Sequence, residues 1–131
     1  MDLRAKAIDI RKDIVNLIYH AGTGHIGGDL SVTDILVDLY YKQMNVGPDK
    51  VQDPERDRFV LSKGHCVEAL YTILADKGFF PKEELQTYSQ YLSKFIGHPN
   101  NKIAGVEVNS GSLGHGLAVG VGMALAAKDR K

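Results

Sequence analysis

The segment that most constrains the fold is the short run Arg58–Ser62, because it is the only stretch of the 131 residues that reads as a β-strand. Its apolar centre is preceded by charged residues and followed by Gly64, which is typical of a short strand. A strand followed by a helical segment indicates a parallel sheet of the α/β class. One strand does not make a sheet, so we expect its partner strands to lie beyond Lys131 or in another chain.

The rest of the chain is predicted to be mostly helical. An apolar stripe at steps of four and three runs from Leu3 to Ala21, with Asp2 as its N-cap and Gly22 and Gly24 at its end. A second helix is expected from Ser31, because Ser31 and Asp34 together resemble a capping box. Further helices are expected over His65–Lys77, from Pro81, and over Gly116–Lys131. Segment 94–115 reads as a glycine-punctuated loop. The final helix is rich in small residues that let another backbone approach, so we expect it to be packed rather than exposed.

Composition disfavours several classes of function. Lys plus Arg and Asp plus Glu number 16 each, so the chain lacks the basic excess of a nucleic-acid-binding domain. The single cysteine, Cys66, cannot form an internal disulfide, which fits a reducing compartment. The N-terminus has no apolar stretch of a secretory signal, and no apolar run approaches the ~20 residues of a spanning helix. We therefore expect one cytoplasmic domain over residues 1–131, with neither a nucleic acid nor a membrane as partner.

Histidines follow glycines unusually often in this sequence. Four of the five directly follow a glycine, whereas about 0.5 such pairs are expected by chance from the composition. Glycine permits a sharp bend and leaves the next side chain projecting, so the pattern predicts one concave site built from loops. The four are His25, His65, His98 and His115. A zinc site is disfavoured, because the sequence has no His-Glu-x-x-His motif and only one thiol.

A glycine-rich turn, Asn109–Gly116, directly precedes the final helix. Its glycines let main-chain N–H groups point at one spot, and the helix N-terminus adds a partial positive charge that suits a phosphate. The turn lacks the Lys-Ser/Thr pair of a P-loop and does not follow a predicted strand as a Rossmann fingerprint does. His65 projects from the carboxyl end of the expected strand, where ligands bind in open α/β sheets. An imidazole there can donate a hydrogen bond to a phosphate oxygen.

Five motifs, taken in order, resemble the transketolase family. They are Gly24–Gly28, Asp57–His65, Gly97–Pro99, Gly105–Glu107 and Gly111–Gly116. The resemblance covers essentially the whole chain and is strongest to the short N-terminal subunits of split bacterial and archaeal transketolases. It implies the N-terminal part of an α/β thiamine-diphosphate-binding fold, mostly helical here, with one short strand at about 58–62.

The resemblance also implies roles for individual residues. His25 would contact the donor sugar at the reacting carbons, and His98 would contact substrate hydroxyls. His65 would bind the cofactor diphosphate and lie near the reacting centre. The cofactor-binding turn would consist of Gly111, Ser112 and Leu113.

The sequence departs from the family pattern in several places. Ile26 stands where proline is common and Asp29 where Ser or Pro is expected, both in positions expected beside the substrate, so the donor sugar stays open. His115 stands where Gln is more usual and is expected behind the substrate-contacting residues. The Gly-Asp-Gly motif and following Asn that would bind magnesium are absent from these residues, so we expect no metal site here. The chain alone is therefore expected to bind thiamine diphosphate weakly or not at all and to be inactive.

The complete enzyme implied by the resemblance would transfer a two-carbon ketol unit between sugar phosphates in the pentose phosphate pathway. It would use thiamine diphosphate and Mg²⁺, form a homo-oligomer (a dimer in related enzymes) and pair with a C-terminal transketolase subunit. Two alternatives stay open: another thiamine-dependent synthase, of the dihydroxyacetone or deoxyxylulose phosphate type, and a non-catalytic assembly module. The helix at 117–128 is a candidate interface, and an unpaired strand would make the isolated chain associate or be marginally stable.

Overall fold

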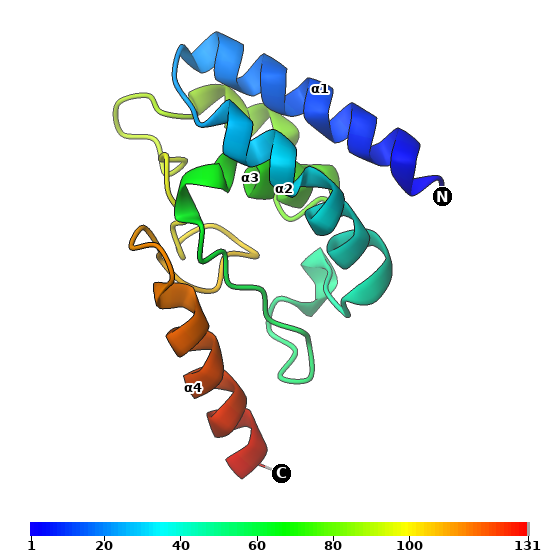
Figure 1. The fold of residues 1–131 in the computed structure, drawn as a ribbon, viewed down its shortest axis with the longest axis vertical. Helices are drawn as coiled ribbons and strands as arrows, with labels where there is room; N and C mark the ends of the chain where they lie inside the picture. The colour runs from blue at the N-terminus through cyan, green and yellow to red at the C-terminus, as the bar shows by residue number, and fades with distance from the viewer. Residues whose placement is uncertain (131) are drawn as a thin grey trace.

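Three helices pack on one another in one part of the molecule, and a fourth extends away from them (Figure 1). Residues 1–130 are described by a computed structural model. The helices are α1 (Leu3–Ala21), α2 (Ile26–Asp38), α3 (Val67–Asp76) and α4 (His115–Asp129). Within residues 1–130, no helix combines the length and the apolar character needed to cross a membrane.

Helix α1 has the bounds predicted from the sequence. The Asp2 carboxylate accepts a hydrogen bond from the N–H of Arg4 at 2.9 Å, which caps the first turn. At the other end Gly22 adopts a left-handed conformation with φ of 67°, and its N–H donates to the carbonyl of Ile18. The buried face consists of Ala7, Ile10 and Ile14. Local capping and periodicity are sufficient to define this helix.

Helix α2 begins at Ile26, so the predicted start at Ser31 is wrong. The Ser31 hydroxyl does not cap the helix but donates to the carbonyl of Gly28 at 3.0 Å. The added turn is held by burial of Asp29, which is fully inaccessible, as is Thr33 one turn later. Packing of this polar face extends the helix through glycines that alone would disfavour it.

Helix α3 is the centre of the core. Every residue from Val67 to Ala75 is buried, and the helix packs against both α1 and α2. A 3₁₀ turn, η3 (Gly64–Cys66), leads into it, and no local side chain caps its first turn. The cap comes from α2, because the Asp29 carboxylate accepts from the N–H of Ala69 at 2.9 Å. Helices α2 and α3 are thus joined by a buried polar contact as well as by apolar packing.

The strand predicted at Arg58–Ser62 is not formed in the part of the chain described here. This segment is irregular, and residues 1–130 contain no strand. Leu61 is buried as its apolar neighbourhood predicts, but its carbonyl accepts a hydrogen bond from the Ser110 hydroxyl at 2.6 Å. A strand requires a neighbouring strand for its ladder, and the part of the chain described here supplies a loop hydroxyl instead.

Short helical turns and loops complete the fold. A π-helical turn, η1 (Leu39–Gln43), extends α2, and 3₁₀ turns follow at η2 (Pro48–Lys50) and η4 (Lys82–Thr87). The helix expected from Pro81 is therefore a 3₁₀ helix, with the proline just before it. Segment 94–114 is irregular as predicted, and it is attached to the core by the buried side chains of Phe95 and Ile103.

Helix α4 differs from the expectation that it would be packed. Gly116 is its one buried residue among those described, and its N–H donates to the Ser62 hydroxyl at 3.2 Å. Leu117, Val121 and Leu125 are 75%, 52% and 60% exposed. Figure 1 shows the helix extending away from the α1–α3 body. The small residues therefore leave α4 open for most of its length.

Candidate functional site

His25 and His65 lie next to each other on the surface. His25 is the residue before α2, and His65 lies in the turn before α3. Their ring centroids are 5.3 Å apart with an interplanar angle of 63°. A Cβ atom on Gly28 would lie 3.5 Å from Cδ2 of His65, so the small residue leaves the His65 ring close to the first turn of α2. Two imidazoles that are 40 residues apart in sequence thus meet where α2 and α3 begin.

His98 joins this region through the glycine-rich turn. A Cβ atom on Gly111 would lie 3.4 Å from Cδ2 of His98, and one on Gly64 would lie 2.9 Å from the carbonyl oxygen of Ser110. Gly64, the residue before His65, therefore lies against Ser110. Gly111, the residue after Ser110, lies against His98. The Tyr71 hydroxyl on α3 donates to the His98 carbonyl at 2.9 Å and holds this loop. The three predicted histidines belong to one continuous surface, with His98 connected through the turn and not by a ring contact.

The turn Gly111–Leu113 is exposed and directly precedes α4. Gly114, which follows it, has a φ of 84° and no side-chain cap on the helix. The N–H groups of residues 111–114 donate to no acceptor within residues 1–130. Free main-chain donors beside a helix N-terminus are suited to an anionic group. Gly111, Ser112 and Leu113 thus offer the chemistry expected of a diphosphate-binding turn.

The two remaining histidines differ from these three. His115 is the first residue of α4 and is exposed beside the turn. His20 lies in the last turn of α1, where its Nδ1 is 2.7 Å from the Asn16 carbonyl and its ring packs edge-on against Tyr19. His20 is thereby accounted for as a local structural residue.

Cys66 is buried between the two helix starts and is not a nucleophile. Burial raises the pKa of its thiol to about 11, and Asp29 and Glu68 add to the effect. Its Sγ lies 3.0 Å from the carbonyl of Lys63, to which the thiol donates. A protonated buried thiol is chemically inert at neutral pH.

Two buried carboxyl groups lie directly beneath the His25–His65 surface. Asp29, expected beside the substrate, is instead fully buried, as is Glu68 on α3. Glu68 Oε1 accepts from the Tyr88 hydroxyl at 2.6 Å and from the main-chain N–H of His25 at 3.3 Å. Sequence reasoning missed Glu68, although an acidic residue inside the otherwise apolar run 66–71 is a signal for it.

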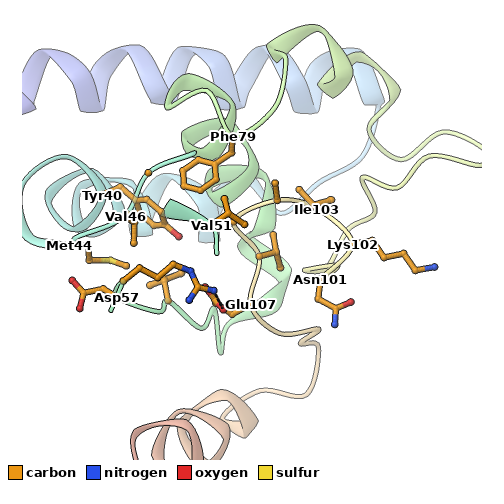
Figure 2. A pocket seen from close by; sticks show the side chains of 16 residues that line it. Tyr40, Met44, Val46, Val51, Asp57, Phe79, Asn101, Lys102, Ile103 and Glu107 are labelled. Carbon is orange, nitrogen blue, oxygen red and sulfur yellow. Dashed lines mark hydrogen bonds and ion pairs between the residues drawn. The ribbon is translucent and has the colours of Figure 1, made fainter. Parts of the chain in front are cut away.

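A pocket lined by other residues does not include the predicted site. Figure 2 shows it between the segment that carries Tyr40 and Val46 and the loop that carries Ile103 and Glu107. Its volume is about 280 Å³, and none of the histidines lines it. Its polar wall is the ion pair of Arg56 with Glu107 at 2.9 Å. We assign this pocket no part in the chemistry of the histidine surface.

The side chains near the histidine surface do not form a metal-binding cluster. Among residues 1–130 there is no group of three or more His, Cys, Asp or Glu side chains that could hold a metal ion. The histidine surface therefore has imidazoles and main-chain donors with which to bind a ligand, and the carboxylates nearest to it are buried.

Comparison with protein families gives a match over almost the whole chain. The family described as the transketolase, thiamine diphosphate binding domain matches residues 3–131. Among curated relatives, an apulose-4-phosphate transketolase subunit of Phocaeicola vulgatus is 55% identical over 118 residues, covering 90% of this chain and 42% of that protein. The subunit of the same name from Actinobacillus succinogenes is 45% identical over 129 residues, covering 98% and 46%. The chain thus spans less than half the length of these relatives.

Solved structures give the same result. A transketolase from Leishmania mexicana superposes with a TM-score of 0.90 at 30% identity, covering 96% of this chain and 19% of that one. A Pichia stipitis transketolase in complex with sedoheptulose-7-phosphate superposes with a TM-score of 0.85 at 36% identity, with the same coverage. The arrangement of helices and loops described above therefore occurs within much longer chains.

Proposed function

Because this chain belongs to the transketolase family of thiamine diphosphate binding domains, we propose that it forms the diphosphate-binding part of an enzyme that transfers a two-carbon ketol unit between sugar phosphates. The observation that carries the proposal is the meeting of the His25 and His65 rings, 5.3 Å apart, on a surface continuous with the glycine turn and His98. Imidazoles can donate, accept or relay protons near neutral pH. The transfer of a ketol unit requires such proton transfers, because carbonyl and hydroxyl groups are interconverted.

The three histidines are proposed to act on different parts of the bound molecules. His65, half-buried and beside the glycine turn through Gly64, is suited to donate to a diphosphate oxygen. His25 is exposed at the start of α2 and is suited to hydrogen-bond the donor sugar at its reacting carbons. His98, exposed and close to Gly111 of the turn, is suited to contact sugar hydroxyls.

Thiamine diphosphate is the proposed cofactor, and the turn Gly111–Leu113 fits its anionic end. The free N–H groups and the absence of side chains at Gly111 and Gly114 let an anion approach the backbone. When bound, the cofactor supplies the carbanion chemistry, whereas residues of this chain bind and orient it. Mg²⁺ is proposed only for the complete enzyme, and no role assigned here depends on it.

The substrates and partners of the complete enzyme are also proposals. The relatives named as apulose-4-phosphate transketolase subunits and a relative named as a 6-deoxy-6-sulfo-D-fructose transketolase subunit support a sugar substrate and a complementary C-terminal subunit. We propose a cytoplasmic homo-oligomer, a dimer, that serves sugar phosphate interconversion of the pentose phosphate type. The exposed face of Leu117, Val121 and Leu125 on α4 supports an interface between chains. Related thiamine-dependent synthases and a purely non-catalytic assembly role stay as alternatives.

Calorimetric titration with thiamine diphosphate and Mg²⁺ tests the proposal in two arms. The full-length protein with its complementary subunit should bind the cofactor and transfer ketol units, and His65→Ala should weaken cofactor binding. A chain of these 131 residues alone should bind it weakly or not at all and be inactive, because it offers one imidazole and main-chain donors to the diphosphate. A micromolar dissociation constant for the short chain would contradict the second arm. Absence of binding by the complete protein would contradict the first and favour the assembly role.

A further inference from the structure

The buried carboxyl groups of Asp29 and Glu68 each have one oxygen without a hydrogen-bond partner within residues 1–130. Asp29 Oδ1 accepts from the N–H of Ala69, and Glu68 Oε1 accepts from Tyr88 and His25, but Oδ2 and Oε2 receive nothing. Both side chains are completely inaccessible to solvent. An unmatched buried carboxylate oxygen is costly, and two of them on adjacent carboxylates are costlier still.

The surroundings favour a protonated carboxyl over two charges. Burial is the largest cause that raises the pKa of Asp29, to about 7, and the negative charge of the neighbouring Glu68 adds to it. The N–H of Ala69 and the charge of Lys63 act in the opposite direction without outweighing burial. Cys66 and Tyr71 on the α3 side and Tyr88 after η4 also face the pair, and none of these is a cation. His25 lies above the pair and donates its main-chain N–H to Glu68, and its ring is next to that of His65.

We propose, on the basis of the function proposed above, that Asp29 and Glu68 share one proton between Oδ2 and Oε2 and act as positioning residues for His25. A single proton satisfies both unmatched oxygens and leaves one net charge, which is the arrangement of two carboxyl groups that cannot both ionise in one buried place.

The route from the pair to His25 is short. Glu68 Oε1 accepts the main-chain N–H of His25, the residue at which α2 begins. A Cβ atom on Gly24 would lie only 2.8 Å from the same oxygen, so the backbone before His25 passes directly over the Glu68 carboxyl. Tyr88 holds Oε1 from the other side. A second negative charge would push the carboxyl groups apart and move the His25 backbone relative to His65.

Infrared spectroscopy of the full-length protein tests the shared proton directly. We expect a protonated-carboxyl C=O band at about pH 6, well above the ordinary titration of Asp and Glu near 4. The band should disappear in Asp29→Asn and in Glu68→Gln, because an amide then supplies the hydrogen bond to the remaining carboxylate. It should survive in Asp34→Asn, a matched control on the exposed face of α2, where the carboxylate pairs with Arg11. No band at this pH, or a band that survives both buried substitutions, overturns the shared proton.

Kinetics of the complete enzyme test the positioning role. Glu68→Ala removes the acceptor for the His25 N–H, so we expect kcat to fall about 10- to 100-fold, as for a misplaced catalytic group, with little change in the KM for thiamine diphosphate. Glu68→Gln keeps an acceptor oxygen and should restore kcat to within about threefold of the native value. Ile10→Ala is the stability control, because Ile10 is fully buried on α1 and its truncation lowers stability through lost burial.

The outcomes separate this inference from the function on which it rests. If the native enzyme transfers ketol units and Glu68→Ala leaves kcat unchanged, or if Ile10→Ala lowers kcat equally at an equal loss of stability, the positioning role is wrong. If the native enzyme shows no ketol transfer, the proposed function is wrong, and the infrared band still decides whether the pair shares a proton.

Discussion

Helices α3 and α4 are both rich in apolar residues, yet the structure uses them in opposite ways. In α3 every residue from Val67 to Ala75 is buried, whereas in α4 Gly116 is the one buried position described. Helix α3 packs against both α1 and α2, and Tyr71 packs against Phe95 of the loop that follows. Helix α4 is joined to the body at its first turn, where the N–H of Gly116 donates to the Ser62 hydroxyl. Apolar composition alone therefore does not determine burial; the position that the flanking loops give to a helix does.

Helices α3 and α4 therefore contribute to the site in different ways. Helix α3 positions the histidine surface, because the turn that leads into it carries His65, its Glu68 accepts from His25 and its Tyr71 holds the His98 loop. Helix α4 contributes the free N–H groups before its first turn and an exposed apolar face. Changes in α3 should therefore affect stability and site geometry together, whereas changes on the exposed face of α4 should have little effect on either.

Truncation of one leucine in each helix gives the strongest test of this difference between α3 and α4. Leu74 on α3 is fully buried, so Leu74→Ala should lower the free energy of unfolding by about 2–5 kcal/mol through lost burial and the cavity left behind. Leu125 on α4 is 60% exposed, so Leu125→Ala should change it by less than about 0.5 kcal/mol. Urea denaturation of both variants gives the values. Equal losses would mean that α4 contributes to the core.

What can be predicted from the sequence depends on whether a local signal or a tertiary contact determines the element. Helix α1 is predicted residue for residue, because its cap at Asp2 and its stop at Gly22 act within one turn. The strand predicted at Arg58–Ser62 is not formed within residues 1–130, because a strand needs a neighbouring strand, and local apolar character does not tell whether one is present. The start of α2 is wrong for a related reason: Ser31 offers a local cap, but burial of Asp29 against α3 extends the helix.

The candidate site is partly predictable. Glycine–histidine pairs mark bends from which a side chain projects, and the rings of His25 and His65 do meet, with His98 reached through the glycine turn. The carboxyl groups beneath them are not predicted as a pair. Asp29 and Glu68 come from different helices, and no spacing within the sequence reports such a tertiary contact.

The pH dependence of stability sharpens the description of the α2–α3 interface. Burial raises the pKa of Asp29 to about 7, whereas the same carboxyl titrates near 3.9 in an unfolded chain. Between these values the folded state binds more protons than the unfolded state, so stability should fall as pH rises, by up to about 1.4 kcal/mol per pH unit. This contribution is fully present below about pH 4 and absent above about pH 7.

Denaturation at several pH values, with two matched variants, isolates that effect. Asp29→Asn should abolish the decline between pH 4 and 7. Asp34→Asn should retain it, because a hydrogen bond from Arg11 lowers the pKa of Asp34, so its contribution is lost only as pH falls. A native protein whose stability is flat or rises across this range would show that Asp29 is ionised in the folded state.

Glycine substitutions in α4 give the smallest expected effect and examine how this helix is attached. A Cβ atom on Gly116 would lie 2.7 Å from Cβ and 2.8 Å from Cα of Ser62, so Gly116→Ala should loosen the junction and speed amide exchange in the first turn of α4. Gly120 has open space around it, so Gly120→Ala should stabilise the helix by up to about 1 kcal/mol through helix propensity and slow exchange there. Hydrogen exchange read residue by residue separates the two. If Gly120→Ala also speeds exchange, α4 packs along its length in solution, and the contrast with α3 is smaller than the structure indicates.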